Sequence, residues 1–79
     1  MHLEIVTPEK SLYSGEVELV QLPGKNGSFE ILEKHAAIVS SLEKGKIKLK
    51  EVDGETIFFE INGGVIECKN NVISVLADS

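Results

Sequence analysis

Apolar and polar side chains alternate along almost the whole of this chain. In one example, Lys46, Lys48 and Lys50 alternate with Ile47 and Leu49. Successive side chains of a β-strand point to opposite faces of a sheet, so a period of two predicts strands with one apolar and one polar face. The nearest helical candidate, residues 31 to 42, carries β-branched residues and two serines and lacks a period of 3.6. The chain is therefore predicted to be all-β.

A proline and a change of phase mark the first two strands. Residues 2 to 6 alternate and are followed by Thr7-Pro8, where the proline removes a backbone donor and ends the strand. Between Tyr13 and Leu22 the inward positions change phase, and a β-bulge near Leu19 accommodates this change by adding one residue. We expect the inward-facing residues of this second strand to be Val17, Leu19, Val20 and Leu22.

Asp53-Gly54 predicts a hairpin, and the apolar pattern on either side sets its register. A two-residue loop would mix apolar and charged residues on one face of the hairpin. A three-residue loop, 52 to 54, instead places Ile47 opposite Phe59 and keeps that face apolar. We predict the three-residue loop, with Gly54 in the left-handed conformation.

The same register turns Phe58 to the opposite face of the hairpin, near Lys48. Phe58 is then either a core residue of a second face or a contact with a partner, and the pattern supports both interpretations equally. The three lysines 46, 48 and 50 share this face. A row of ammonium groups on one side of a strand is typical of a solvated surface.

Two further turns complete the pattern. Gly63-Gly64 interrupts one strand, and Asn70-Asn71 closes another hairpin because asparagine tolerates a positive φ. A two-residue loop at Asn70-Asn71 directs Cys68 into the core. Since about eight to ten short strands follow one another with turns between them, we predict an antiparallel β-sandwich or flattened barrel.

Length and composition are those of one domain, residues 1 to 79, and they argue against several classes of function. A domain of this size buries only about 60% of the surface of its unfolded chain and has a single core. Thirteen acidic and eight basic residues give a net charge of −5, which disfavours nucleic-acid binding. No apolar run is long enough to span a bilayer, no secretory signal is present, and Cys68 is the only cysteine. We therefore expect a cytoplasmic chain without disulfides.

Catalytic, metal-binding and phosphate-binding patterns are weak. His35 is the only interior histidine, and Ser40 lies on a strand rather than on the sharp turn that usually presents a nucleophile. Glu30, Glu33 and His35 share no strand face or helical spacing, so no metal site is expected. The glycines of residues 24 to 27 lack the spacing and the following helix of a phosphate-binding loop. These residues indicate a domain that works by contact, with the exposed loop 25 to 35 as its most distinctive surface.

The same loop carries a specific resemblance. Leu22-Pro23-Gly24, the segment 27 to 32, His35-Ala36 and the opening LEIVTPEKSLYSGEVE are similar to the N-terminal domain of the epsilon subunit of F-type ATP synthase. The closing segment, with Gly63-Gly64 and the residues 71 to 78, resembles the last hairpin of that domain. The resemblance spans residues 3 to 78 in order.

This resemblance implies a β-sandwich in the central rotor stalk that binds the gamma subunit and the membrane ring of c subunits. Such a subunit performs no chemistry, needs no cofactor or metal, and lies peripherally at the cytoplasmic face of the cell membrane. The resemblance assigns contact with the c ring to Ser28, Glu30, Glu33, Lys34 and His35. It assigns contact with gamma to Thr7 and Ser40, and we add Phe58 on physical grounds.

The chain departs from the usual family pattern at three loop positions and at its end. Glu30 replaces a glycine, and Glu33 and Ala37 replace prolines, so the loop is more acidic and less constrained. Typical members continue past residue 78 into a helical hairpin, so the sequence reads as a short form or a truncated one. The alternative function is a free-standing β-sandwich that binds a small molecule, although one tyrosine and three phenylalanines provide few aromatics for a binding cleft.

Overall fold

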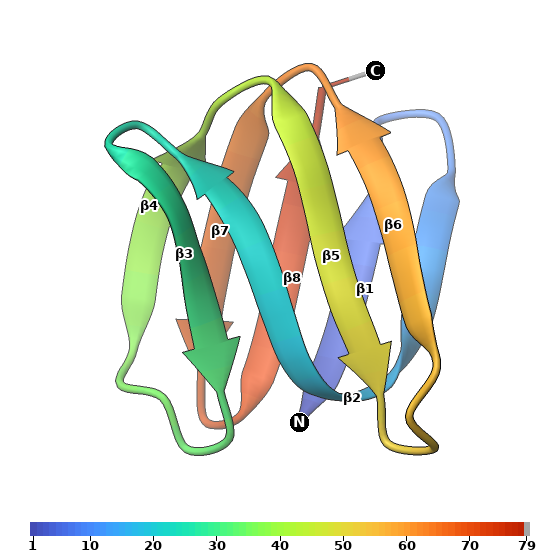
Figure 1. Cartoon of the computed structure of the whole chain (residues 1–79). Coiled ribbons are helices and arrows are strands. Elements are labelled where there is room, and N and C mark those ends of the chain that lie inside the picture. The colour runs from blue at the N-terminus through green and yellow to red at the C-terminus, as the bar shows by residue number, and fades with distance from the viewer. Residues whose placement is uncertain (79) are drawn as a thin grey trace.

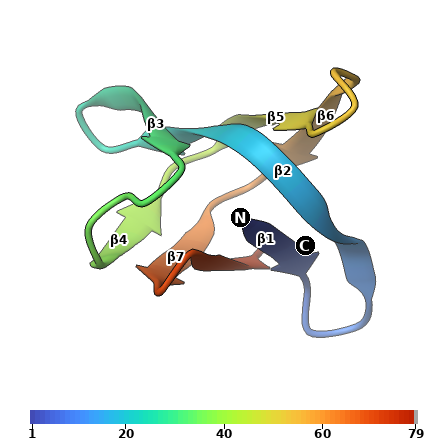
Figure 2. The ribbon, with the colours of Figure 1, turned by 90° about the horizontal axis from the view of Figure 1, so that it is seen from below.

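Strand β2 (Ser11–Gly24) connects the two layers of the fold. In this computed structural model, which describes residues 1–78, the first part of β2 pairs with β1 and its second part pairs with β5 and β3. Figure 2 shows β2 passing from one layer to the other. The other strands are β1 (His2–Val6), β3 (Gly27–Leu32), β4 (Ile38–Leu42), β5 (Gly45–Glu51), β6 (Thr56–Ile61), β7 (Gly64–Lys69) and β8 (Val72–Ala77).

The sheet folds over itself at β2 to form two layers. The first sheet contains β4, β7, β8, β1 and the start of β2, in that order, and the second contains β3, the rest of β2, β5 and β6. In Figure 1 the second sheet lies in front of the first. The predicted all-β sandwich of short strands is confirmed. Neighbouring strands are antiparallel except for β1 and β8, which run parallel. The predicted antiparallel pairing does not hold for these two strands, because turn signals indicate only how strands that follow one another in the sequence pair.

The core lies between the two sheets and is entirely apolar within the described residues. Alternate residues of the strands face inward, as the period of two predicts. Within residues 1–78 no helix has the length and apolarity needed to cross a membrane. Ten side chains have no exposed surface: Leu3, Ile5, Val17, Val20, Leu22, Ile31, Ile47, Leu49, Ile66 and Ile73.

The predicted bulge in β2 is present, but it changes the position of one side chain. The register of β2 against β5 shifts between Val17 and Leu19. Leu19 pairs with Lys50 and Leu32, both on the outer face of the second sheet, and it is only half-buried. Our expectation that Leu19 faces inward was wrong, because the extra residue of the bulge, Glu18, comes before Leu19 and turns it outward.

The predicted hairpin registers are confirmed. Ile47 pairs with Phe59 across a three-residue loop, and Gly54 has a φ of +95°. In the turn between β7 and β8, Asn70 and Asn71 have φ values of +53° and +65°. This two-residue turn directs Cys68 into the core, where it is 2% exposed. Turn residues and apolar phase were sufficient here because both are local signals.

Gly64 should tolerate no side chain. Its φ is +152°, and a methyl group at this position would overlap the carbonyl oxygen of Leu76 on the neighbouring strand. Replacement by alanine should therefore lower the free energy of unfolding by at least about 3 kcal/mol, because backbone strain and steric overlap add. Denaturant-induced unfolding measures the loss.

Gly27 provides the matched control. It also has a positive φ, +112°, but no atom lies within 4 Å of the position that its methyl group would take. Gly27→Ala should cost only about 1–2 kcal/mol, through backbone strain alone. Equal losses in the two variants would show that overlap with Leu76 is not the reason for glycine at position 64.

Candidate functional site

Hydrogen bonds hold the loop between β3 and β4 to the turn between β7 and β8 in the first sheet. The Glu33 carboxylate accepts hydrogen bonds from the Asn71 side-chain amide and, at 3.2 Å, from the α-amino group of Met1. The backbone N–H of Lys34 donates to Oδ1 of Asn71 at 3.0 Å. We call Glu33, Lys34 and Asn71 the loop clamp. It joins residues 37 or 38 positions apart in the chain.

The clamp keeps the Glu33 carboxylate charged. Its hydrogen bond from Asn71, and then the bond from the Met1 ammonium, lower the pKa of Glu33 below the ordinary glutamate value of 4.5. Sequence reasoning assigned Asn71 to the turn and missed its side chain as a partner of the loop. Only the loop's unusual glutamate, in a position that is usually proline, could have drawn attention to it.

His35 is exposed and Ser40 is half-buried. The side chain of each one contacts the backbone of the residue that follows it. Nδ1 of His35 lies 2.7 Å from the carbonyl oxygen of Ala36, and the Ser40 hydroxyl donates to the carbonyl oxygen of Ser41 at 3.1 Å. The structure therefore gives neither residue the pairing that activates a nucleophile.

Ser28 lies near the start of β3, and Glu30 lies in the middle of this strand. Both are exposed on its outer face, and the Ser28 hydroxyl accepts a hydrogen bond from the Gln21 amide at 3.1 Å. Glu33 directly follows β3 and is five residues on from Ser28, a distance of about 17 Å for extended chain. The hairpin of β2 and β3 and the loop between β3 and β4 lie at opposite ends of the molecule in Figure 1. The five residues expected at the c ring thus form two groups rather than one.

The three residues expected to contact gamma are also separated. Thr7 lies in the turn after β1, where its backbone N–H donates to the carbonyl oxygen of Lys10. Ser40 lies on β4, at the far edge of the first sheet. Phe58 lies on the outer face of the second sheet, with 58% of its surface exposed. The structure thus places Phe58 on a surface rather than in a second core.

An apolar patch that the sequence reasoning missed lies on the outer face of the first sheet. Val39, Val65 and Leu76 are exposed there, and Val65 pairs directly with Leu76. We call this surface, together with Val6, the valine face. The signal was the run Val75-Leu76-Ala77, which is apolar on both faces of β8. A hollow of about 400 Å³ in this face is lined by Glu4, Val6, Val65, Glu67, Ser74, Val75 and Leu76.

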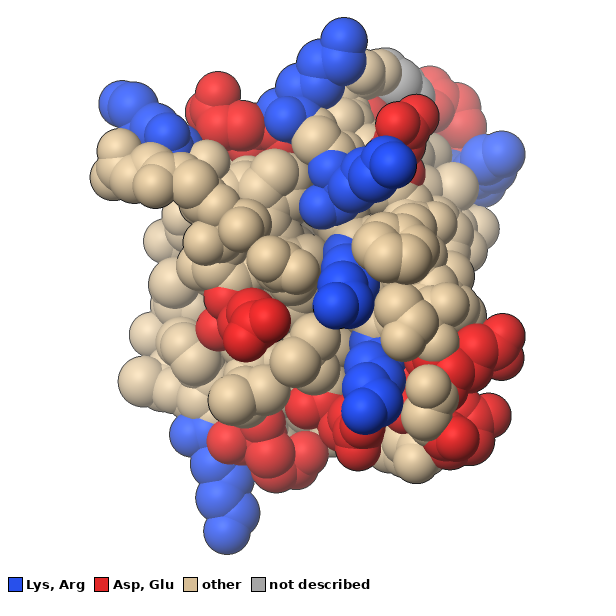
Figure 3. All heavy atoms as spheres, in the orientation of Figure 1, with Lys and Arg blue, Asp and Glu red and all other residues tan. Residues whose placement is uncertain are grey.

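The outer face of the second sheet is basic instead. Lys46, Lys48 and Lys50 point outward from β5, while Ile47 and Leu49 are fully buried, as the alternation predicted. Figure 3 shows these basic side chains as a column along β5. The two outer faces of the sandwich therefore differ in chemistry.

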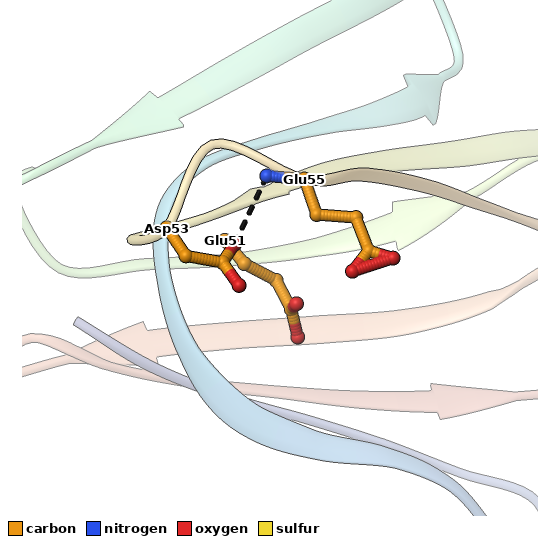
Figure 4. A group of neighbouring side chains, drawn as sticks. All are labelled: Glu51, Asp53 and Glu55. Carbon is orange, nitrogen blue, oxygen red and sulfur yellow. Dashed lines mark hydrogen bonds between the residues drawn. The ribbon is translucent and has the colours of Figure 1, made fainter.

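Three carboxylates gather at the turn between β5 and β6. Glu51, Asp53 and Glu55 approach within 4.8 Å of one another, and Asp53 accepts a hydrogen bond from the backbone N–H of Glu55 (Figure 4). Glu51 also accepts the hydroxyl of Tyr13 at 2.5 Å. Burial and then this hydrogen bond raise the pKa of Tyr13 to about 12. Two of the three carboxylates are thus engaged within the protein, in structural contacts.

Comparisons with known proteins place this geometry in context. The profile of the family described as "ATP synthase, Delta/Epsilon chain, beta-sandwich domain" matches residues 1–79. The ATP synthase epsilon chain of Caulobacter vibrioides is 39% identical over 79 residues, which cover 99% of this chain and 90% of that protein. The epsilon chain of Alkalilimnicola ehrlichii is 33% identical over 79 residues, and this chain, aligned in full, spans 56% of its length.

A solved structure shows the same fold. A chain in the Euglena gracilis mitochondrial ATP synthase, in a structure of its OSCP, F1 and c-ring, superposes with a TM-score of 0.85 at 16% identity. The alignment covers 95% of this chain and 48% of that one.

The loop clamp predicts how the pKa of Glu33 responds to substitution. Asn71→Gly keeps the positive φ of the turn and removes the amide, so the pKa of Glu33 should rise toward 4.5. Because the native pKa is lowered, Glu33 stabilises the fold above its unfolded pKa, and this contribution is lost as pH falls through the folded pKa. Carboxyl NMR titration measures the shift. Asn70→Gly is the control and should leave the pKa of Glu33 unchanged.

Proposed function

Because this chain belongs to the family of ATP synthase delta and epsilon chains, through their β-sandwich domain, we propose that it is a non-catalytic rotor subunit of an F-type ATP synthase. In this role it binds the gamma subunit and the ring of c subunits and passes the rotation of the ring to gamma. The observation that carries the proposal is the match over residues 1–79, together with 90% coverage of the Caulobacter epsilon chain. The family resemblance stated from the sequence is confirmed by the same match.

The local contacts of the polar residues support a mechanical role. The side chains of His35 and Ser40 bond to the backbone of the next residue. At the turn between β5 and β6, Glu51 accepts a hydrogen bond from the Tyr13 hydroxyl and Asp53 accepts one from a backbone N–H. These groups fix loops and turns, which suits a rigid connector. We place the subunit peripherally at the cytoplasmic face of the membrane, held by its partners.

We propose that gamma docks on the valine face. Thr7 directly follows Val6, at the end of β1, so it borders this face. Ser40 follows Val39 on β4 but pairs with the fully buried Ile66, so its side chain points to the inner side of the sheet. Exposed apolar side chains on adjacent strands are typical of protein interfaces, and desolvating them contributes about 25 cal/mol per Å². Phe58 lies on the other sheet and does not belong to this contact.

We propose that the c ring is contacted mainly by the hairpin of β2 and β3, through Ser28 and Glu30. Both side chains are exposed on the outer face of β3, Ser28 next to the hairpin tip and Glu30 in mid-strand, and Glu30 replaces the glycine of the usual pattern. Exposed ion pairs contribute less than about 1 kcal/mol each, so several polar contacts must act together. Glu33 is occupied by the loop clamp, and Lys34 and His35 lie beside it as candidates for a second contact at the opposite end.

A free-standing ligand-binding module is the alternative. The hollow on the valine face is its best support, since it is apolar and bordered by Glu4 and Glu67. However, valine, leucine and serine provide no aromatic surface on which a small molecule could stack. A docking surface for gamma accounts for the same hollow.

Replacing Leu76 by glutamate should disrupt the gamma contact. Leu76 is 51% exposed in the middle of the valine face, and a buried charge there removes the apolar contact and adds a desolvation cost. We expect the amount of gamma recovered with the tagged chain from solubilised membranes to fall at least about tenfold. Phe58→Glu, on the other outer face, is the control and should leave recovery unchanged. The reverse result would place gamma on the second sheet, and absence of gamma with the unaltered chain would contradict the rotor role.

Site-directed cross-linking should distinguish the two ends of β3. Ser28→Cys, labelled with a maleimide photo-cross-linker in the assembled complex, should form a product with the c subunit. His35→Cys should form much less of it. Cys68 is 2% exposed, and burial raises the pKa of its thiol, so it contributes little background. A product from His35→Cys alone would move the ring contact to the loop between β3 and β4.

A further inference from the structure

A second hollow, of about 280 Å³, lies at the end of the second sheet where β5 begins and β6 ends. The loop between β4 and β5 and the turn between β6 and β7 form its rim. It shares no lining residue with the hollow on the valine face. We call it the lysine hollow. It is lined by Lys44, Gly45, Lys46, Glu60, Ile61 and Asn62.

Backbone contacts fix both walls of the lysine hollow. The N–H of Glu43 donates to the carbonyl oxygen of Pro23 at 2.9 Å and anchors the loop between β4 and β5. Gly45 packs closely on the same proline, because a methyl group added to it would lie 2.9 Å from the Cβ of Pro23. The N–H of Asp78 donates to the carbonyl oxygen of Gly63 at 2.9 Å and anchors the turn between β6 and β7. The walls are therefore in place before a ligand binds, which lowers the entropic cost of binding.

The charged groups of the lysine hollow are not paired with one another. Within residues 1–78 the one lysine that forms an ion pair is Lys50, so Lys44 and Lys46 have none. Lys46 and Glu60 are cross-strand neighbours on β5 and β6, yet they form no ion pair either. All three side chains are exposed. Figure 3 shows basic and acidic side chains next to one another at this end of β5. Both kinds of charge are thus available to a ligand.

The chemistry of this lining suits a small phosphate ester. Two ammonium groups donate to phosphate oxygens, and the Asn62 amide supplies a further donor. Glu60 has the opposite preference, because a carboxylate accepts a hydrogen bond from a hydroxyl and repels an anion. The Glu43 and Asp78 carboxylates lie next to the hollow, the latter beside Gly63. These acidic neighbours favour a ligand with a single phosphate over a polyanion.

We propose that the lysine hollow binds a phosphate ester that carries a hydroxyl group close to the phosphate, as glycerol phosphate does. Lys44 and Lys46 hold the phosphate, and Glu60 accepts the hydroxyl. The same chemical group occurs in soluble glycerol phosphate and in the head group of phosphatidylglycerol. The contact of Gly45 with Pro23 places the hollow at the end of the molecule that carries the hairpin of β2 and β3. In the proposed rotor role this end faces the membrane ring, where lipid head groups are concentrated.

Titration of the isotope-labelled chain with glycerol 3-phosphate, followed by NMR, tests the proposal without the assembled complex, so its result is independent of the rotor role. We expect saturable shifts at residues 44 to 46 and 60 to 62, and weaker binding of inorganic phosphate. Lys44→Gln combined with Lys46→Gln should weaken binding of glycerol 3-phosphate at least about tenfold. Glu60→Gln should remove the preference for the ester over inorganic phosphate, because it removes both the repulsion and the strong acceptor.

The matched control changes two exposed lysines elsewhere. Lys10→Gln combined with Lys69→Gln alters the net charge equally and should preserve binding. Equal weakening in both pairs would overturn the proposal, because it would show a response to net charge alone. Shifts that do not saturate, or equal affinity of the unaltered chain for inorganic phosphate and the ester, would overturn it as well.

Vesicles distinguish the two sources of the ligand. The unaltered chain and the Lys44→Gln, Lys46→Gln variant are sedimented with vesicles of phosphatidylcholine alone or mixed with phosphatidylglycerol. Binding that needs phosphatidylglycerol and is lost in the variant would support the proposal and assign the lipid head group. Saturable binding of glycerol 3-phosphate without binding to either vesicle would support it and assign a soluble ester.

Discussion

The bend of β2 is the constraint on which the other features of this structure depend. One strand pairs with β1 in the first sheet and with β5 and β3 in the second, and the extra residue at Glu18 changes its phase between the two. Without this shift, Val17 and Val20 could not both face the core, since they are three residues apart in a strand of period two. The bulge thus fixes the stacking of the sheets and determines which side chains reach each outer face.

The stacking leaves two outer faces with different capacities for binding. On the first sheet, Val65 and Leu76 form an apolar patch on central strands, bordered by Glu4 and Glu67, and desolvating its apolar part is favourable. On the second sheet, the lysines on β5 have polar and apolar cross-strand neighbours, such as Gln21 and Phe58 beside Lys48, so this face is basic. The two faces therefore favour partners of different chemistry, and a partner that suits one face competes poorly for the other.

Local signals predicted most of the fold, and contacts between distant residues account for most of what was missed. Strand phase, Gly54 and the Asn70-Asn71 turn determined the hairpins because each involves neighbouring residues. Leu19 was assigned to the wrong face because the sequence shows that a bulge exists but not which residue it adds. The candidate site was harder still. The bond of Asn71 to Glu33, the separation of Ser28 from Glu33 and the continuity of the valine face all depend on how strands are ordered in space.

In the proposed rotor role, transmission of force adds a requirement beyond affinity. Exposed ion pairs contribute less than about 1 kcal/mol each and rearrange easily, so polar contacts at the end of the sandwich can set direction but cannot by themselves bear a load. A load-bearing contact needs area, close packing and a rigid support. Here the support is a core in which ten side chains have no exposed surface and no polar side chain is buried within residues 1–78. Because Val65 and Leu76 lie on strands whose inner residues, Ile66 and Val75, belong to that core, a push on the valine face is transmitted directly into the rigid part of the molecule.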